Sequence, residues 1–243
     1  MRTLVMVPTY NERDNLDWIV GRLRAAEPDV DVLVVDDASP DGTGELAEAF
    51  AQRDPHVRVL HRAGKEGLGR AYIDAMHWGI AHGYEVLVEM DADGSHRPEQ
   101  LGRLLAPLRE RRGPDAVDVV LGSRWIPGGA VENWPWRRLA ISRVGSAYAR
   151  FALGLKVHDV TGGYRAFRAS ALEEIDLDAV HSHGYAFQVD MLYRAVRAGL
   201  TVVEVPITFH ERERGQSKMS TGIVAEAMLR VSWWAVSRRR ARG

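Results

Sequence analysis

Short apolar runs alternate with amphipathic stretches through the first half of the chain. Apolar residues in the stretches recur at helical spacing, as at Leu16, Ile19 and Leu23, whereas the runs have the length of buried strands. Strands separated by such helices predict right-handed crossovers and a mainly parallel sheet, hence an α/β fold. The predicted strands are Thr3–Val7, Val32–Val35, Val57–Leu60, Glu85–Met90 and Val117–Leu121, and the predicted helices are Asn15–Glu27, Thr43–Arg53, Gly69–Ala81 and Pro98–Glu110.

The second half is less regular. No repeat, low-complexity tract or linker divides the chain, so we predict one domain over residues 1–243. The pattern predicts helices at Trp136–Phe151, Phe187–Ala198 and Ile223–Val236, strands at Tyr164–Arg168 and Thr201–Val205, and a mobile polar loop at Phe209–Ser220.

Polar motifs follow three of the predicted strands at the point where each ends. They are Pro8-Thr-Tyr-Asn-Glu12, Asp36-Asp37 and Asp91-Ala-Asp93. The carboxyl ends of parallel strands share one edge of the sheet, where α/β proteins bind ligands. The sequence therefore predicts a site at that edge.

Asp91 and Asp93 are the candidate metal ligands. In an extended segment they point to the same side, and two carboxylates suit a hard cation such as Mg²⁺ or Mn²⁺ that bridges a nucleotide diphosphate. The alternative is a turn whose aspartate caps the helix beginning at Pro98. The position directly after a hydrophobic strand favours the metal.

Other polar groups have two interpretations. Asp36-Asp37 either binds a base or ribose through its carboxylates or forms a turn, and both remain open. Arg124, Arg138, Arg212 and Lys218 either hold phosphates by charge-assisted hydrogen bonds or are solvated surface charges. The glycines of segment 64–69 do not have the spacing of a known phosphate-binding loop, and we predict a loop where the backbone approaches a ligand or the sheet.

Composition narrows the class of protein. The 243 residues are 46% hydrophobic and 27% charged, which is typical of a globular protein with a sizeable core. The absence of cysteine excludes disulfides, cysteine-ligated zinc and a thiol nucleophile, and is compatible with a cytoplasmic location. No signal-peptide pattern opens the sequence, and no apolar run approaches the ~18 residues of a membrane span.

The formal net charge of −1 conceals a basic end, because five arginines and no acidic residue lie between Arg230 and Gly243. With Trp233-Trp234, they favour peripheral contact of the terminal helix with an anionic membrane. A tryptophan pair packed on the protein body is the alternative. Nucleic acid is disfavoured because the rest of the chain carries no basic stripe.

Taken together, the ordered motifs resemble the family-2 inverting glycosyltransferases, and among them the polyprenol- or dolichol-phosphate mannose synthases. The resemblance runs from about Thr3 to about Thr221. Its motifs are Pro8-Thr-Tyr-Asn-Glu12, Val35-Asp-Asp37, Ser39-Pro-Asp-Gly42, Met90-Asp-Ala-Asp93, Gly122-Ser-Arg124, Gly162-Gly-Tyr-Arg165, Glu204–Phe209 and Gly215-Gln-Ser-Lys218.

The resemblance implies a GT-A fold, a Rossmann-like mainly parallel sheet with helices on both faces, with a nucleotide-sugar half at residues 1–122 and an acceptor half at 123–243. It implies transfer of mannose from GDP-mannose to a polyprenyl phosphate with Mg²⁺ or Mn²⁺. The implied nucleotide-sugar contacts are Pro8, Tyr10, Glu12, Val35, Asp37, Asp91, Ala92, Asp93, Arg124, Arg212 and Lys218. The resemblance implies catalytic roles for Asp91, Asp93, Arg124, Arg212 and Lys218. It also implies Asp91, Asp93 and Ser95 as metal ligands and Arg138 as the contact of the acceptor phosphate.

The chain departs from some relatives at two positions. Ser95 stands where some members carry a metal-binding glutamine, and Gln188 stands where relatives that act on alcohols have an acidic residue, which leaves Asp190 as the acid of that segment. A phosphate monoester with a second pKa near ~6 is already an anion at neutral pH. It needs no general base, and direct attack would invert the anomeric carbon.

The sequence is also compatible with two other functions. One is transfer of glucose or an aminosugar from a UDP-sugar to a polyprenyl phosphate. The other is a non-catalytic nucleotide-sugar-binding subunit of a membrane protein. For the enzyme itself we expect a position on the cytoplasmic face of a membrane, with a separate membrane-protein subunit as a further candidate partner.

Overall fold

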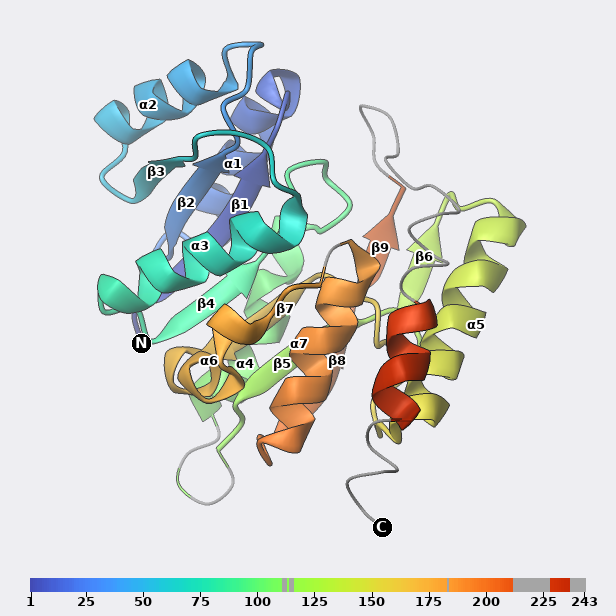
Figure 1. Ribbon diagram of the computed structural model, residues 1–243. Helices are drawn as coiled ribbons and strands as arrows, with labels where there is room; N and C mark the ends of the chain where they lie inside the picture. The colour runs from blue at the N-terminus through green and yellow to red at the C-terminus, as the bar shows by residue number, and fades with distance from the viewer. Residues whose placement is uncertain (111–112, 114–115, 183, 212–227, 237–243) are drawn as a thin grey trace.

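The computed structural model describes residues 1–110, 113, 116–182, 184–211 and 228–236 (Figure 1). A seven-stranded sheet in the order β3-β2-β1-β4-β7-β5-β8 forms the centre. All neighbouring strands are parallel except β7, which is antiparallel to both β4 and β5. The predicted mainly parallel sheet is therefore confirmed. The strands are β1 (Thr3–Thr9), β2 (Asp31–Asp36), β3 (Val57–His61), β4 (Val86–Glu89), β5 (Val119–Ser123), β7 (Arg165–Arg168) and β8 (Val202–Pro206).

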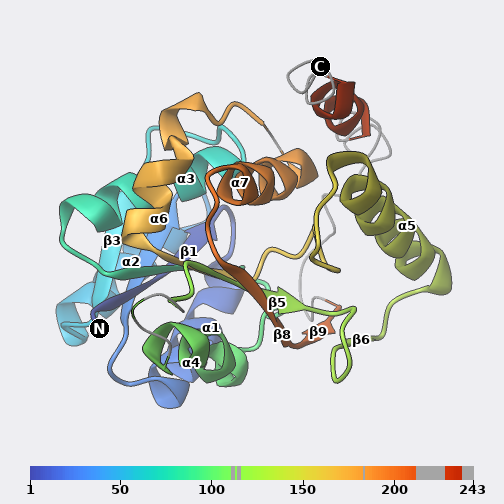
Figure 2. The same ribbon diagram turned by 90° about the horizontal axis from the view of Figure 1, so that it is seen from below.

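Helices cover both faces of the sheet, because successive residues of a buried strand point to opposite sides. In β1, Leu4 and Met6 pack into one apolar core, and Val5 and Val7 pack into the other. One face carries α1, α2 and α4 and the opposite face carries α3, α6 and α7 (Figure 2). The helices are α1 (Arg13–Ala26), α2 (Thr43–Arg53), α3 (Leu68–Ala81), α4 (Leu101–Glu110), α6 (Ala169–Ile175) and α7 (Tyr185–Arg197), with 3-10 turns at Pro98–Gln100 and Leu177–Ala179.

A second, two-stranded sheet pairs β6 (Ala130–Glu132) with β9 (Thr208–His210) in parallel. The sequence pattern did not predict this sheet, because strands of three residues are too short for a periodic pattern. It also placed Phe209 and His210 in the mobile loop Phe209–Ser220, and that part of the prediction was wrong. The remainder of the loop, from residue 212, lies outside the described residues.

Helix α5 (Trp136–Leu153) and the helical residues 228–236 lie side by side, away from the central sheet (Figure 1). The hydroxyls of Tyr148 and Ser232 are hydrogen-bonded at 2.6 Å. The predicted helix Ile223–Val236 is confirmed over residues 228–236, and its earlier part lies outside the described residues. Among the helices described here, none has the length and apolar character needed to span a membrane.

Candidate active site

A cavity of about 580 Å³ opens beyond the carboxyl ends of β1, β4 and β5. It includes the crevice between β1 and β4, where the chain order reverses across the sheet and α/β proteins bind ligands. Residues from distant parts of the chain line it. The predicted site residues on its wall are Pro8, Tyr10, Glu12, Asp37, Asp91, Ala92, Asp93, Ser95, Arg124 and Arg138.

Three predicted contacts are not on this wall. Val35 is fully buried in β2 and belongs to the apolar core, so its side chain is not available to a nucleotide. Arg212 and Lys218 lie outside the described residues, and their assigned roles stay predictions.

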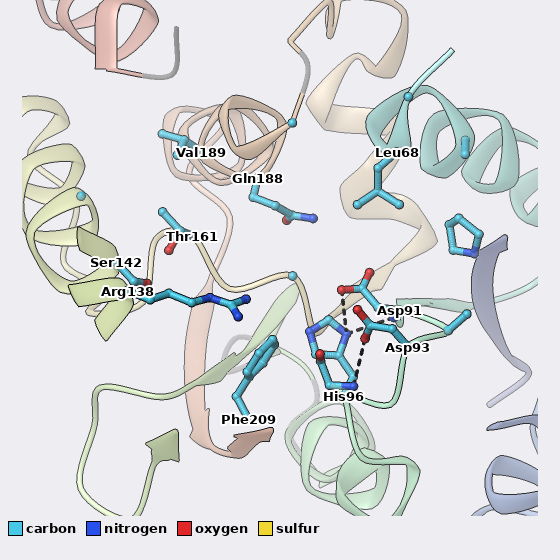
Figure 3. A pocket seen from close by; sticks show the side chains of 18 of the residues that line it. Leu68, Asp91, Asp93, His96, Arg138, Ser142, Thr161, Gln188, Val189 and Phe209 are labelled. Atoms are coloured by element: carbon cyan, nitrogen blue, oxygen red, sulfur yellow. Dashed lines mark hydrogen bonds and ion pairs between the residues drawn. The ribbon is translucent and has the colours of Figure 1, made fainter. Parts of the chain in front are cut away.

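Asp91 and Asp93 face the cavity side by side (Figure 3). Because β4 ends at Glu89, they lie in a turn and not in the extended strand that the sequence suggested. The Tyr72 hydroxyl donates to Asp91 Oδ1 at 3.2 Å, and the backbone N–H of Ser95 donates to Asp93 Oδ1 at 3.0 Å. The turn therefore fixes both carboxylates before any ligand binds.

The tightness of this turn depends on Gly94. Its φ of +79° lies in the left-handed region, and a Cβ there would approach the Trp18 ring to 2.6 Å. Residues other than glycine would meet both backbone strain and a steric clash.

His96 lies beneath the aspartates and is almost fully buried. Its Nδ1 accepts the backbone N–H of Asp91 at 3.0 Å, so the neutral ring carries its hydrogen on Nε2. Burial lowers the pKa of His96 despite the nearby aspartates. The ring stacks on Tyr164 at a centroid distance of 4.9 Å and meets the edge of Phe209 at 5.5 Å. His96 therefore supports the backbone that carries Asp91.

The carboxylate pair suits a hard divalent cation. Asp91, Asp93 and Ser95 all line the cavity and carry side-chain oxygen atoms, and oxygen is the ligand type that Mg²⁺ and Mn²⁺ prefer. No group of three or more histidine, aspartate or glutamate residues arranged to hold a metal occurs in the described part of the chain. The remaining coordination positions would fall to ligand phosphates and water, as Mg²⁺ commonly arranges them.

The two carboxylates of Asp36-Asp37 have different environments. Asp36 is buried and accepts hydrogen bonds from Thr9 Oγ1 at 3.1 Å and from Ser39 Oγ at 2.6 Å, so it closes the turn. Asp37 lines the cavity and pairs with Arg62. Burial raises the pKa of Asp37, and Arg62 counters that rise. Of the two interpretations, the turn fits Asp36 and the ligand contact fits Asp37.

The guanidinium of Arg124 is largely engaged by the protein. It donates from Nε and Nη2 to the two oxygens of fully buried Asp159, each at 2.7 Å, and from Nη2 to Thr161 Oγ1 at 3.1 Å. A buried bidentate pair of this kind orients the side chain firmly. Its Nη1 makes no hydrogen bond to the described residues, which leaves that nitrogen for a ligand in the cavity.

Arg138 projects from α5 into the cavity toward the centre of Figure 3. Its Nη1 donates to Glu211 at 2.7 Å, and its charge lies 4.2 Å from the centre of the Trp134 ring. Arg138 Nε and Trp134 Nε1 are buried and have no hydrogen-bond partner among the described residues. Two unpartnered N–H donors on one wall favour an anionic ligand, because a buried donor without an acceptor costs free energy.

The apolar end of the cavity lies between α5 and residues 228–236. Aliphatic and aromatic groups form it, in contrast to the carboxylates at the other end. They are Ile141, Gly145, Tyr148, Ala149, Met228 and Val231.

At the other end the cavity reaches the loop before α3. Lys65 lies 4.2 Å over the Tyr10 ring, and both line the cavity with Gly67. A Cβ on Gly69 would approach the Phe187 ring to 2.8 Å. Gly69 thus allows α3 and α7 to approach closely, and Gly67 brings backbone to the cavity as the sequence suggested.

Asp190, the remaining acid of the α7 segment, does not face the cavity. It is buried, it accepts a hydrogen bond from the Ser182 hydroxyl, and it pairs with Arg194 at 2.9 Å. It therefore has no access to an acceptor.

Sequence reasoning did not single out several residues of the wall as ligand contacts. Trp134 and Phe209 come from β6, β9 and their flanks, where no periodic pattern gave a signal. Gln188 was noted only as the replacement of an acid. The principal additional lining residues are Lys65, His96, Trp134, Ser142, Thr161, Gln188 and Phe209.

The sheet has this strand order and helices on both faces, a carboxylate pair follows β4, and a cavity lies at the strand ends. This is the architecture of the nucleotide-sugar-dependent glycosyltransferases. The chain belongs to glycosyl transferase family 2, whose family model matches residues 4–176. The resemblance found in the sequence is thereby confirmed.

Two relatives are similar over nearly their full length. The polyprenol monophosphomannose synthase of Mycolicibacterium smegmatis is 56% identical, over 100% of this chain and 91% of that protein. The undecaprenyl-phosphate mannosyltransferase of Micrococcus luteus is 57% identical, over 98% of this chain and 96% of that protein.

Among solved structures, the chain is similar to glucosyl-3-phosphoglycerate synthase from Mycobacterium tuberculosis, in complex with Mn²⁺, UDP-glucose and phosphoglyceric acid. The TM-score is 0.71 at 18% identity, over 96% of this chain and 79% of the other. At this identity the likeness shows the common fold.

Proposed function

We propose that this protein transfers mannose from GDP-mannose to a polyprenyl monophosphate, in a reaction that depends on Mg²⁺ or Mn²⁺ and inverts the anomeric carbon. The two close relatives are named as mannose-transferring enzymes that act on polyprenol or undecaprenyl phosphate. The observation that carries the proposal is one continuous cavity with carboxylates at one end, an apolar wall at the other, and Arg138 between them.

The carboxylate end is the donor site in this proposal. Asp91 and Asp93 would hold the divalent ion, which neutralises charge on the leaving diphosphate when bound. Arg124, whose Nη1 makes no hydrogen bond within the described part of the chain, is a cationic group on the same cavity wall. Asp37 is positioned to accept hydrogen bonds from the base or ribose, and Tyr10 offers an apolar ring.

The acceptor phosphate binds at Arg138 and the Trp134 indole N–H. An ionised phosphate attacks without a general base, which agrees with the engagement of Asp190 by Ser182 and Arg194. Arg138 holds the nucleophile in line with the anomeric carbon, and a single displacement inverts that centre. The residues therefore supply position and charge and move no proton.

The lipid chain leaves the site along the apolar wall between α5 and residues 228–236. Both helices also expose large apolar side chains, among them Trp136 at 73%, Phe151 at 82%, Leu229 at 72% and Trp233 at 67%. An amphipathic surface of this kind favours a peripheral membrane position. Trp234, by contrast, stacks on Tyr193 at 6.2 Å. The cytoplasmic face and a separate membrane-protein subunit stay predictions from the sequence.

A panel of donors and acceptors tests the proposal. Purified protein with Mn²⁺ receives GDP-mannose, UDP-glucose or UDP-N-acetylglucosamine, together with a short polyprenyl phosphate or the matching polyprenol, and mass spectrometry identifies the lipid product. We expect a mannosylated lipid from GDP-mannose and the phosphate only. A product from a UDP-sugar would instead establish the alternative donor, and a product from the alcohol would contradict the base-free mechanism. Donor binding without any product would support a non-catalytic subunit.

A further inference from the structure

Gln188 is the polar residue of α7 that enters the cavity, between Val189 on one side and Leu68 on the other (Figure 3). The residue is 6% exposed. Its Nε2 donates to Glu89 Oε2 at 2.8 Å. Because this bond uses the amide nitrogen, the oxygen Oε1 is the atom left for a ligand.

Gln188 Oε1 is buried and has no hydrogen-bond partner among the described residues. A buried amide oxygen without a donor raises the free energy of the folded protein. Such an atom at a cavity wall is satisfied when a ligand supplies an O–H or N–H group.

A glycine lies beside Gln188 at the cavity wall. Gly163 forms the wall between Gln188 and His96, since a Cβ there would lie 3.7 Å from Gln188 Nε2 and 3.5 Å from His96 Cε1. A side chain at this position would occupy the space between the imidazole and the amide. Backbone without a side chain therefore lines the cavity beside Gln188.

The location along the cavity indicates which ligand group meets Gln188. Asp91 and Asp93 lie toward one end of the view in Figure 3, and Arg138, Ser142 and Thr161 lie toward the other, with Gln188 between the two sets. In the proposed reaction the leaving diphosphate and the acceptor phosphate occupy these two ends. The transferred sugar must lie between them, beside Gln188.

Resting on the proposed function, we propose that Gln188 is a specificity-determining residue whose Oε1 accepts a hydrogen bond from one hydroxyl of the donor sugar. Glu89 acts as its positioning residue, because its carboxylate holds the Gln188 amide nitrogen and so directs the oxygen at the sugar.

The contacts that fix the position of Gln188 support this assignment. Arg165 is fully buried opposite Glu89 in the antiparallel β4–β7 pair, and its Nη1 donates to the Gln188 carbonyl at 2.6 Å. The backbone and the side chain of Gln188 are thus held by two different strands. Such fixation makes a single hydroxyl position selectable, since a site built to bond a hydroxyl rejects a substrate that lacks it.

Singly deoxygenated GDP-mannose donors test the assignment. The variant Gln188→Met keeps the length of the side chain and removes the hydrogen-bond acceptor. The unaltered protein should lose roughly 10- to 100-fold in kcat/KM with the one deoxy donor that lacks the bonded hydroxyl, because that donor leaves one buried acceptor unpaired. Gln188→Met should use that donor and GDP-mannose with nearly equal kcat/KM, while the other deoxy donors should show the same losses in both proteins.

Glu89→Met supplies the test of the positioning role. It should reduce the loss for the same deoxy donor and leave the losses for the other positions unchanged, a pattern that a general structural defect would not produce. Equal deoxy patterns in the unaltered protein and Gln188→Met would overturn the assignment. If that variant does not fold, full use of every deoxy donor by the unaltered protein would overturn it as well.

The outcomes separate this assignment from the proposed function. Absence of transfer by the unaltered protein from every donor would contradict both. Transfer of mannose to the lipid phosphate with a deoxy pattern that is independent of Gln188 would contradict the assignment alone.

Discussion

Asp91 and Asp93 lie at the predicted edge of the sheet, but the local structure that places them there differs from the predicted one. Both line the cavity, but they do so from a turn that Gly94, Ser95 and Tyr72 stabilise. Strand alternation, the basis of the prediction, ends at Glu89. Their ligand role follows from carboxylate chemistry and stays a prediction.

We expect Asp91→Asn and Asp93→Asn each to lower the transfer rate by roughly 100-fold or more, because each removes a charged oxygen ligand. The melting temperature should change little, since both side chains lie at the cavity wall. Transfer rates across a Mn²⁺ titration check this, with the exposed Asp17→Asn as the control. Full turnover by either variant, or by the unaltered protein in excess EDTA, would contradict the metal role.

Arg138 and Arg137 are adjacent cations in different settings. Arg138 enters the cavity, whereas Arg137 is exposed beside Trp136. Arg138→Ala should therefore lower kcat/KM for the polyprenyl phosphate by about 100-fold, because a phosphate-orienting charge is lost, and Arg137→Ala should change it by less than about threefold. Initial rates at varied acceptor concentration distinguish the two. Equal effects would mean that general surface charge is responsible.

The burial of Glu89 predicts that the free energy of unfolding depends on pH. Its complete burial raises its pKa to about 7, although Arg165 and the Gln188 amide favour the charged form. The unfolded-state pKa is about 4.3, so the folded state binds a proton that the unfolded state releases. The stabilisation is fully present below about pH 4.3 and is lost as pH rises through 7, at up to about 1.4 kcal/mol per pH unit.

Glu89→Gln removes this titration and keeps the shape of the side chain. Relative to the unaltered protein, the variant should gain stability steadily between pH 5 and 7 and hold that gain above pH 7. Urea unfolding in EDTA at several pH values measures the difference, with the exposed Glu174→Gln on α6 as the control. A difference that stays constant with pH would show that Glu89 is already ionised at pH 5.

At the scale of elements, the first half of the chain matched its pattern closely. The predicted helix Gly69–Ala81 corresponds to α3, and Thr43–Arg53 corresponds to α2. The predicted helix Pro98–Glu110 divides into a 3-10 turn and α4. These elements are long and bury one face, so local spacing carries the information. Strands β6 and β9 exist because they pair with each other, which no local pattern reports.

The contact of α3 with α7 gives a prediction at this scale. Gly69→Ala places a Cβ about 2.8 Å from the Phe187 ring, and such overpacking costs about 1–3 kcal/mol. Gly64→Ala serves as the control, because nothing lies within 4 Å of its Cβ position. Chemical denaturation should show a loss of stability for the first variant only. An unchanged free energy of unfolding in Gly69→Ala would mean that the two helices separate easily.

On the scale of the whole molecule, α5 and residues 228–236 form a projecting unit with exposed apolar side chains (Figure 1). The sequence predicted α5 but not which way its apolar residues face: Val144 and Phe151 are 63% and 82% exposed. The predicted division at residue 122 remains a proposal. The sheet itself crosses that division, because β7 lies between β4 and β5.

This surface predicts membrane binding. Phe151→Ser combined with Trp233→Ser should weaken binding to anionic vesicles by at least about tenfold, since burying a large apolar side chain contributes about 1.5–3 kcal/mol. Val196→Ser on α7, also exposed, is the control. Vesicle sedimentation at low and high salt separates the apolar contribution from that of the basic residues. Binding that persists in the double variant would place the membrane contact elsewhere.

The sequence by itself determined the α/β class, the edge of the sheet that carries the site, and the family. These depend on local spacing and on polar residues at strand ends, and parallel topology brings those ends together without further information. Only the tertiary structure decided that Asp159 engages Arg124, that Asp190 is occupied, and that Glu89 orients Gln188. Such contacts join residues far apart in the chain, and their geometry depends on packing and burial that no local pattern contains.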